Sequence, residues 1–304
     1  MTIDVKTTTR ETMPAGLTGI PEAYAWCKEY TKERAKNFYY AFAILPEAKR
    51  NAIYAAYAFS GLVDDIADEL TDRAEQEHQL ATARARLHAC YRSEHEGPLF
   101  VALADAVRAY HVPLDFFEEL VNGVEMDFTT NRYDTWEDLY QYCYRVASMV
   151  GLICTSVFGT KPDPEAKTYA IEMGIALQIV NIMRDVREDA ERGRVYFPAA
   201  DLVAHGLTAD DILACRYDER FATMMRMQGA RAHDYFRRGR RLLPLLDLRS
   251  RMCVNVLQGV YAEILKRIEA CDYDVLNERV TLSGREKMTS IGKLWLQAVA
   301  VRGA

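Results

Sequence analysis

Residues 178–198 read QIVNIMRDVREDAERGRVYFP, and four polar residues of this stretch recur at helical spacing between apolar neighbours. The four are Gln178, Asn181, Asp185 and Asp189. Carboxylates and carboxamides between apolar flanks cost several kcal/mol per buried ion, roughly, unless cations or hydrogen-bond donors compensate them. The stretch therefore predicts one helical wall of a polar site, and the nature of the compensating group becomes the central question.

The composition favours long helices with short connections. Only 16 Gly and 9 Pro interrupt the 304 residues, and alternating β-branched runs are few. We predict an all-α protein in which residues 21–304 form one helical domain around a central cavity. The Thr-rich residues 1–20 have no apolar signal-peptide core, and we expect them to be a disordered leader.

The hydrophobic periodicity predicts the main helices and leaves their connections polar. They are expected over residues 22–44, 47–69, 71–94, 115–128, 136–159, 218–246 and 251–270, with the opening stretch as a further helix. Asp134 is expected to cap the helix that follows it. A short amphipathic helix is expected over 286–300; it either docks on the core or contacts a membrane peripherally.

Charge and cysteine usage restrict the partners and the compartment. The formal net charge is -6, and the basic residues are dispersed, so a nucleic acid is not an expected partner. Seven cysteines with no CxxC pair favour free thiols in a reducing cytoplasm. The weakly polar run 146–160 is too short to span a bilayer. The sequence does not indicate an oligomeric state.

A second helix, predicted over 47–69, ends in the same way as the opening stretch. It is almost wholly apolar from residue 52 to 63, and Tyr57, Asp64 and Asp68 then share one face. Each acidic set alone also fits a solvated helix end or a network of i,i+4 ion pairs. Two such helices facing each other would hold several oxygens near Mg²⁺, with water and phosphate completing its coordination. The two sets together favour a metal and diphosphate site.

Four motifs in chain order resemble those of the squalene and phytoene synthases, the head-to-head prenyl transferases of the isoprenoid synthase fold. They are YAFSGLVDDIADE at 57–69, YCYRVASMVG at 142–151, the opening stretch, and NERV at 277–280. The resemblance covers about residues 30–285. It implies that two prenyl diphosphates bind in one helical cavity through Mg²⁺, or Mn²⁺ in its place. One ionises to an allylic cation, and the other attacks it to give a cyclopropylcarbinyl diphosphate that can rearrange.

The resemblance also implies roles for individual residues. The metal ligands are expected to be Asp64, Asp68, Asn181, Asp185 and Asp189. Catalytic roles, at the reaction centre or on the diphosphates, are expected for Tyr142, Gln178, Arg184, Tyr196, Tyr261 and Arg279. Substrate contacts are expected from Arg34, Phe38, Phe42, Tyr57, Val146, Arg192 and Arg194. Arginine suits phosphate oxygens, so residues 192–194 are expected to close over a diphosphate, with a plain surface turn as the alternative.

Two positions bear on the substrate. The family usually carries an arginine three residues before the first aspartate of its first acidic motif, where this chain has Gly61. Phe42 lies one helical turn beyond Phe38, at a position where a bulky residue accompanies C15 chains in the family. The resemblance therefore favours farnesyl diphosphate and a squalene-type or presqualene-type product.

Alternatives to this function remain open at the level of the sequence. Phytoene synthesis from geranylgeranyl diphosphate is the alternative within the same chemistry. A non-catalytic assembly or binding protein of the same fold is the alternative of another class. No GxGxxG fingerprint is present, and the use of NADPH is left undecided.

Overall fold

The computed structural model describes residues 19–34, 36–277 and 279–281. Within these residues the fold is all-α, as predicted; strand-like pairing is limited to one isolated bridge between Arg132 and Val195. The first half contains α1 (Ile20–Arg34), α2 (Lys36–Phe42), α3 (Glu47–Glu69), α4 (Arg73–Tyr91), α5 (Pro98–Tyr110), α6 (Leu114–Thr129), α7 (Trp136–Cys143), the π-helix η2 (Tyr144–Ser148) and α8 (Met149–Phe158). The second contains α9 (Ala166–Arg184), α10 (Val186–Glu191), α11 (Ala199–Ala204), α12 (Ala209–Leu213), α13 (Glu219–Gly239), the 3₁₀ helix η3 (Arg240–Leu245) and α14 (Leu248–Ala270).

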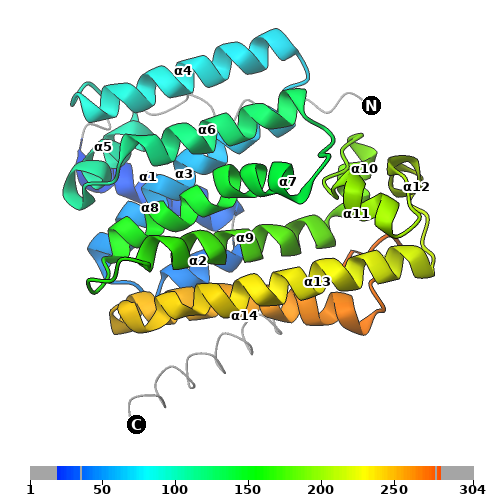
Figure 1. The fold of residues 1–304 in the computed structure, drawn as a ribbon. Coiled ribbons are helices and arrows are strands. Elements are labelled where there is room, and N and C mark those ends of the chain that lie inside the picture. Colours follow the sequence, from blue (N-terminus) through cyan, green and yellow to red (C-terminus); the bar gives the residue numbers. More distant parts are fainter. Residues whose placement is uncertain (1–18, 35, 278, 282–304) are drawn as a thin grey trace.

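The helices stack in layers around α9 (Figure 1). α4 is the outermost helix on one side and packs on α5 and α6, whereas α13 and α14 pack against α9 on the opposite side. α3 lies inside the first layer, in contact with α1, α5 and α6. This arrangement places α3 and α9, the two helices with acidic ends, in the interior of the bundle.

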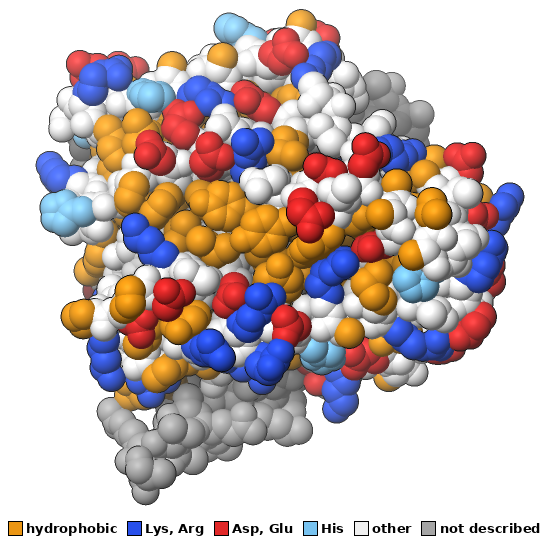
Figure 2. All heavy atoms as spheres, viewed as in Figure 1, with side chains coloured by type: hydrophobic (Ala, Val, Ile, Leu, Met, Phe, Trp, Pro, Cys, Tyr) orange, Lys and Arg blue, Asp and Glu red, His pale blue; other side chains and the backbone are white. Residues whose placement is uncertain are grey.

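The core consists of two apolar clusters. In the first, Phe59 of α3 meets Phe100 and Phe117 edge to face, with ring centroids 6.3 and 5.5 Å apart. The second is built on α9, α13 and α14 and includes Met183 and Phe221, both fully buried. Burying such a side chain stabilises the fold by about 1.5–3 kcal/mol. Figure 2 shows that hydrophobic side chains also form a band across the middle of one face, with charged side chains around it.

The sequence patterns located most helices but missed several interruptions. The helix predicted over 22–44 is divided into α1 and α2, and the one over 136–159 is divided by η2. Thr135 caps α7, not Asp134, because the Thr135 hydroxyl accepts from the Asp138 N–H in a capping box. The helices α5, α11 and α12 were not predicted. By contrast, α3 has the predicted bounds.

The π-helix η2 shapes the interior because it inserts Val146 and Ala147 into the central cavity. Such wide turns are frequent at functional sites. α9 crosses η2 at Gly174, where a Cβ atom would lie 2.6 Å from the Ser148 Cα and 2.8 Å from the Ala147 carbonyl oxygen. Gly174 is therefore required for this close approach.

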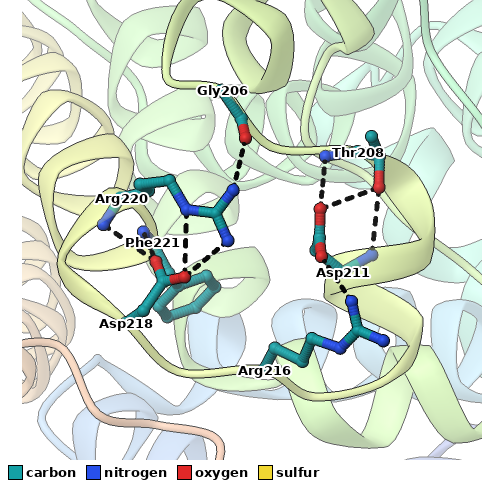
Figure 3. Close-up of polar contacts among 7 residues, drawn as sticks. All are labelled: Gly206, Thr208, Asp211, Arg216, Asp218, Arg220 and Phe221. Carbon is teal, nitrogen blue, oxygen red and sulfur yellow. Dashed lines mark hydrogen bonds and ion pairs between the residues drawn. The ribbon is translucent and has the colours of Figure 1, made fainter.

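Polar contacts among residues 206–221 hold the chain between α11 and α13 in place (Figure 3). Asp211 and Thr208 form a capping box on α12, and Arg216 donates to Asp211 at 2.9 Å. Asp218 caps α13, and Arg220 donates to the Gly206 carbonyl at 2.7 Å. Because α12 packs on α10, these contacts also support α10, which carries Asp189.

The predictions for the ends of the chain are not tested by the structure. The leader predicted over 1–20 lies outside the described residues except for its last two, and Ile20 already begins α1. The helix predicted over 286–300, with its membrane hypothesis, lies wholly outside them. Among the helices that are described, none is both long and apolar enough to cross a bilayer.

Candidate functional site

Two adjoining cavities lie between α3 and α9. The larger, about 700 Å³, is mainly apolar and is lined by residues of α2, α3, η2, α8, α9 and α14. The smaller, about 380 Å³, is polar and contains carboxylates from α3, α6 and α10 together with Asp185. Four residues line both, namely Asp64, Gln178, Asn181 and Arg184. An apolar chain and a charged head group could therefore bind side by side across this boundary.

Every site residue predicted from the sequence lines one of these cavities, although their chemical roles stay predictions. The larger cavity is lined by Arg34, Phe38, Phe42, Tyr57, Val146, Tyr261 and Arg279. The smaller is lined by Asp68, Tyr142, Asp185, Asp189, Arg192, Arg194 and Tyr196. The remaining four belong to the shared boundary given above.

The carboxylates at the end of α3 differ in their partners. Asp68 forms an ion pair with Arg192 at 3.0 Å and a longer one with Arg194 at 3.8 Å. The Asp64 side chain is exposed to the smaller cavity, and protein atoms surround it on its other sides. This desolvation and the negative charge of Asp68 raise the pKa of Asp64 to about 7. Asp64 therefore occupies a position where an added cation would be stabilised.

The opening stretch is not one continuous helix, because the chain bends at Asp185 between α9 and α10. The polar line survives this bend, since its four members all face the smaller cavity. Arg184 pairs with Asp185, and Arg279 donates to the same carboxylate at 2.8 Å. Asp189 is different, because desolvation and the neighbouring charge of Asp185 raise its pKa to about 7.

The donor atoms of this region suit a hard divalent cation. Asn181 donates through Nδ2 to Gln178 at 3.2 Å, which leaves its Oδ1 buried without a hydrogen-bond partner. Buried polar atoms normally have a hydrogen-bond partner, so this oxygen is available to a bound ion or water. Within the described residues, however, no three His, Cys, Asp or Glu side chains form a group that could hold a metal ion. Mg²⁺ at this site would thus need ligands from water and a bound phosphate, as is common for this ion.

Asp127 of α6 is a site residue that the sequence reasoning did not select. Its two carboxylate oxygens accept from the hydroxyls of Tyr196 at 2.9 Å and Tyr142 at 3.1 Å. The two phenol rings stack with their centroids 5.0 Å apart. Burial raises the pKa of Asp127, while the charge of Arg194 opposes that shift. The aromatic surroundings of the helix 115–128 were the only signal, and nothing in the spacing related Asp127 to the two tyrosines.

The turn at residues 192–194 is the bridge between the two acidic walls. Gly193 has φ +74°, in the left-handed region that glycine adopts without strain. The Gly193 carbonyl accepts from Arg132 at 2.8 Å, which anchors the turn while Arg192 crosses to Asp68. The prediction that this turn covers a head group is consistent with its place at the edge of the smaller cavity.

The larger cavity has an aromatic wall. Phe38 lies 5.7 Å from Tyr57 and 6.3 Å from Tyr261, measured between ring centroids. Phe42 is 3% exposed and meets Tyr54 and Tyr57 edge to face, each at 6.2 Å. Aromatic ring faces of this kind can stabilise a cation electrostatically.

Fold and site together define a class: all-α proteins in which an apolar cavity joins a carboxylate-lined cavity between two acidic helices. Comparisons with known proteins agree. The family model described as squalene/phytoene synthase matches residues 31–286, so the chain belongs to the squalene/phytoene synthase family. This is a family of prenyltransferases, and the resemblance seen in the motifs is confirmed.

The chain is similar over nearly its whole length to curated members of this family. It is 35% identical to the 15-cis-phytoene synthase of Synechococcus elongatus, covering 94% of this chain and 96% of that one. It is 37% identical to the phytoene synthase of Mycobacterium tuberculosis, with 89% and 90% covered.

Solved structures agree on the fold. The squalene synthase HpnC of Alicyclobacillus acidocaldarius superposes with a TM-score of 0.79 at 30% identity, covering 84% of this chain and 95% of that one. A dehydrosqualene synthase reaches 0.85 at 23% identity, covering 92% and 98%, and supports the fold alone.

Proposed function

We propose that the protein joins two prenyl diphosphates head to head through a cyclopropylcarbinyl diphosphate. The observation that carries this proposal is the boundary between a carboxylate-lined cavity and an apolar one. The apolar cavity would take the hydrocarbon chains, and the smaller cavity would take the diphosphate groups. Such a boundary allows the charged end to react while the apolar walls exclude water from the carbon atoms.

Three residues of the smaller cavity fit a divalent cation. Asp64, Asn181 and Asp189 would hold Mg²⁺. Among the described residues, the two carboxylates have raised pKa values that a nearby cation would lower, and the Asn181 Oδ1 has no hydrogen-bond partner. Mn²⁺ accepts the same oxygen ligands. When bound, the metal would supply Lewis-acid stabilisation of the departing diphosphate. Arg184, Arg194 and the other cavity arginines would hold the head groups by charge-assisted hydrogen bonds.

The protein's own groups would protect and orient the reacting carbons. The aromatic wall would face the allylic cation with its ring electrons. Tyr142 lies 5% exposed at the smaller cavity, and Asp127 fixes its hydroxyl. We infer that this phenol stands beside the carbons that rearrange.

Asp127→Asn is expected to lower kcat by about 10- to 100-fold with little change in KM. The substitution replaces a charged acceptor for two phenols with a neutral amide, and a hydrogen bond to a charged group is worth about 1.5–3 kcal/mol. Steady-state kinetics would measure both parameters. Glu125→Gln on the same helix is the matched control, since Glu125 pairs with Arg84 and lines neither cavity. Equal losses in the two variants would contradict a positioning role.

We infer that farnesyl diphosphate is the substrate, because bulky Phe42 of α2 lines the larger cavity at a position where the resemblance associates a bulky residue with C15 chains. Its ring packs against Tyr54 and Tyr57 in this wall, and we infer that it limits the chain length on that side. The product would then be of the squalene or presqualene type.

Phe42→Ala is expected to raise the ratio of kcat/KM for the C20 substrate to that for the C15 substrate at least about fivefold. Removing the ring extends the cavity, and burying even one or two further methylene groups is worth roughly 1 kcal/mol. Competition between the two diphosphates would measure the ratio directly. Phe59→Leu serves as a control for general loss of core packing, because Phe59 is buried away from both cavities. An unchanged ratio would place the end of the chain elsewhere.

Geranylgeranyl diphosphate is the second candidate substrate, and a separate observation favours it. The curated relatives at 35% and 37% identity are both named phytoene synthases. If this chain shares their activity, its product is phytoene and the C20 chains must pass Phe42 along the α8 and α14 side of the cavity.

The deciding experiment incubates the purified protein and Mg²⁺ with each diphosphate, with and without NADPH, and identifies the product by mass. The proposal expects a head-to-head product and released pyrophosphate from at least one substrate. No turnover of either substrate by folded protein would overturn it in favour of a non-catalytic binding or assembly role.

A further inference from the structure

The chain between α13 and α14 concentrates positive charge on an otherwise acidic protein. Residues 237–251 read RRGRRLLPLLDLRSR and include six arginines and one aspartate, whereas the whole chain has a formal net charge of -6. We call these residues the basic corner. They comprise the end of α13, the 3₁₀ helix η3 and the start of α14. A local positive charge on a negatively charged protein attracts anions to that part of its surface.

Three exposed arginines of the basic corner form no ion pair with a carboxylate of the described residues. They are Arg240, Arg241 and Arg249. By contrast, Arg237 and Arg238 both pair with Asp234, and Arg251 donates to two carbonyls of the corner itself. A guanidinium has five N–H donors, so the three exposed arginines keep donors for an anion from outside the protein.

Apolar residues separate these arginines in the chain. Pro244 is exposed, and Leu245 and Leu248 are half-buried. The backbone that carries them is held in place, because the Leu245 carbonyl accepts from the Lys161 N–H at 2.9 Å. Interfacial segments of proteins combine the same two features: apolar side chains enter the boundary between headgroups and acyl chains, while basic side chains are attracted to anionic lipids.

The basic corner also forms part of the wall at the apolar end of the larger cavity. Leu242 of η3 lines this cavity together with Val254 of α14 and Phe158 at the end of α8. Figure 1 shows that α13 and α14 meet at the end of the molecule opposite α10, α11 and α12. Since α10 carries Asp189 of the smaller cavity, the basic corner lies at the end of the bundle away from the carboxylates.

We propose that the basic corner docks the protein on a bilayer surface that contains anionic phospholipids. Arg240, Arg241 and Arg249 contact the lipid phosphates, and Pro244 enters the headgroup region. A bilayer fits better than a nucleic acid, because apolar residues separate the arginines and the acidic remainder of the chain repels an extended polyanion. This surface is distinct from the tail helix predicted over 286–300. The docked orientation turns the apolar end of the larger cavity toward the membrane.

Co-sedimentation of the full chain with vesicles tests the arginines. One vesicle population is phosphatidylcholine alone, and the other is equal parts phosphatidylcholine and phosphatidylglycerol. The triple variant Arg240→Gln, Arg241→Gln, Arg249→Gln is expected to lower the partition coefficient on the mixed vesicles about 100-fold, and each single substitution about fivefold. Binding of the wild type should weaken with added NaCl, because mobile ions screen the attraction.

A second triple variant, Arg92→Gln, Arg108→Gln, Arg226→Gln, is the matched control. It removes the same charge from exposed positions outside the basic corner. An equal loss in this control, a partition coefficient of the first variant within about threefold of the wild type, or equal wild-type binding to both vesicle populations would overturn the proposal. If circular dichroism shows that the first triple variant does not fold, the single substitutions decide.

The apolar part of the contact has its own test. Pro244→Glu is expected to lower the partition coefficient about tenfold or more, because a carboxylate cannot enter a negatively charged headgroup region without cost. Val203→Glu on α11 adds the same charge at a residue that is 74% exposed and lies outside the basic corner. Equal losses in the two variants would overturn the insertion of Pro244.

Two further outcomes separate the docking from its alternatives. Tighter binding of single-stranded RNA than of mixed vesicles, lost in the first triple variant, would assign the basic corner to a nucleic acid and overturn the proposal. The docking is also separable from the proposed function. Vesicle binding without product formation would overturn that function alone, whereas product formation by a protein that does not bind mixed vesicles would overturn the docking alone.

Discussion

Asp64→Asn is expected to reduce turnover about 1,000-fold or more while it raises the free energy of unfolding at pH 8. Turnover should fall because a neutral amide is a weaker ligand than a carboxylate for the cation that would stabilise the departing diphosphate in the proposed function. Stability rises because the metal-free protein holds this carboxylate beside Asp68 without an ion pair of its own. The same feature therefore costs folding energy and serves the reaction.

The pH dependence follows from the raised pKa of Asp64. Its ordinary value is 3.8, and the folded protein raises it to about 7, so between these values the folded state keeps a proton that the unfolded chain has lost. Stability then falls as the pH rises through this window, and the cost is fully present above pH 7. Asparagine removes that cost. Because Asp64 faces cavity water, we expect a gain of only about 1 kcal/mol at pH 8.5 and less at pH 5.5.

Urea unfolding at the two pH values without Mg²⁺ measures the stability difference, and product formation with Mg²⁺ measures turnover. Asp210→Asn is the control, an exposed aspartate of α12 that lines neither cavity. Retention of most activity by Asp64→Asn would refute the facing-carboxylate site. A stability gain that is equal at both pH values would refute the electrostatic explanation.

Asp185→Asn is expected to reduce turnover to a similar degree, because the resemblance implies Asp185 as a further metal ligand, but to change stability in the opposite direction. Asp185 is 18% exposed and is the common acceptor of Arg184 and Arg279. Neutralising it leaves two cations with a weaker partner, which should lower the free energy of unfolding by about 1–2 kcal/mol. The loss should shrink at high salt, because mobile anions then screen the two arginines.

The same unfolding and turnover measurements apply, with added NaCl as the further variable. Asp201→Asn is a suitable control, since Asp201 pairs with Arg231 at 2.8 Å and lines neither cavity. If Asp185→Asn were as stable as the wild type, its arginine pairs would be energetically unimportant. The paired outcomes for Asp64 and Asp185 would show that two carboxylates of one site have opposite effects on folding.

The helical period was sufficient to predict the acidic walls, because residues that share one helix face need no tertiary information. It placed Gln178, Asn181 and Asp189 on one line, and the structure keeps them on one cavity. The bend at Asp185 was not predictable. No proline or glycine marks it, and the arginine that stabilises its far side, Arg279, comes from 94 residues away in the chain.

Other features escaped the sequence for the same reason. Asp127 acquires its role from tyrosines on α7 and in the segment after α10, and their distances depend on how three segments pack. Gly61 could be recognised as the lack of an arginine, but only the packing of α1 on α3 reveals that Tyr30 fills the space. Periodicity predicts which side of a helix is polar. Which residues of another helix that side contacts can be known only from the three-dimensional structure.

The boundary shared by the two cavities has a consequence for how such proteins diversify. In the proposed function, the head groups meet the carboxylates and arginines of the smaller cavity, and chain length would be limited by apolar residues that line only the larger one, such as Phe42, Phe158 and Leu242. Mutations at the apolar end can therefore accumulate without disturbing the ionising end. Under the proposed function, this architecture would make product size an evolvable trait that is separable from the reaction itself, and directed evolution could use the same independence.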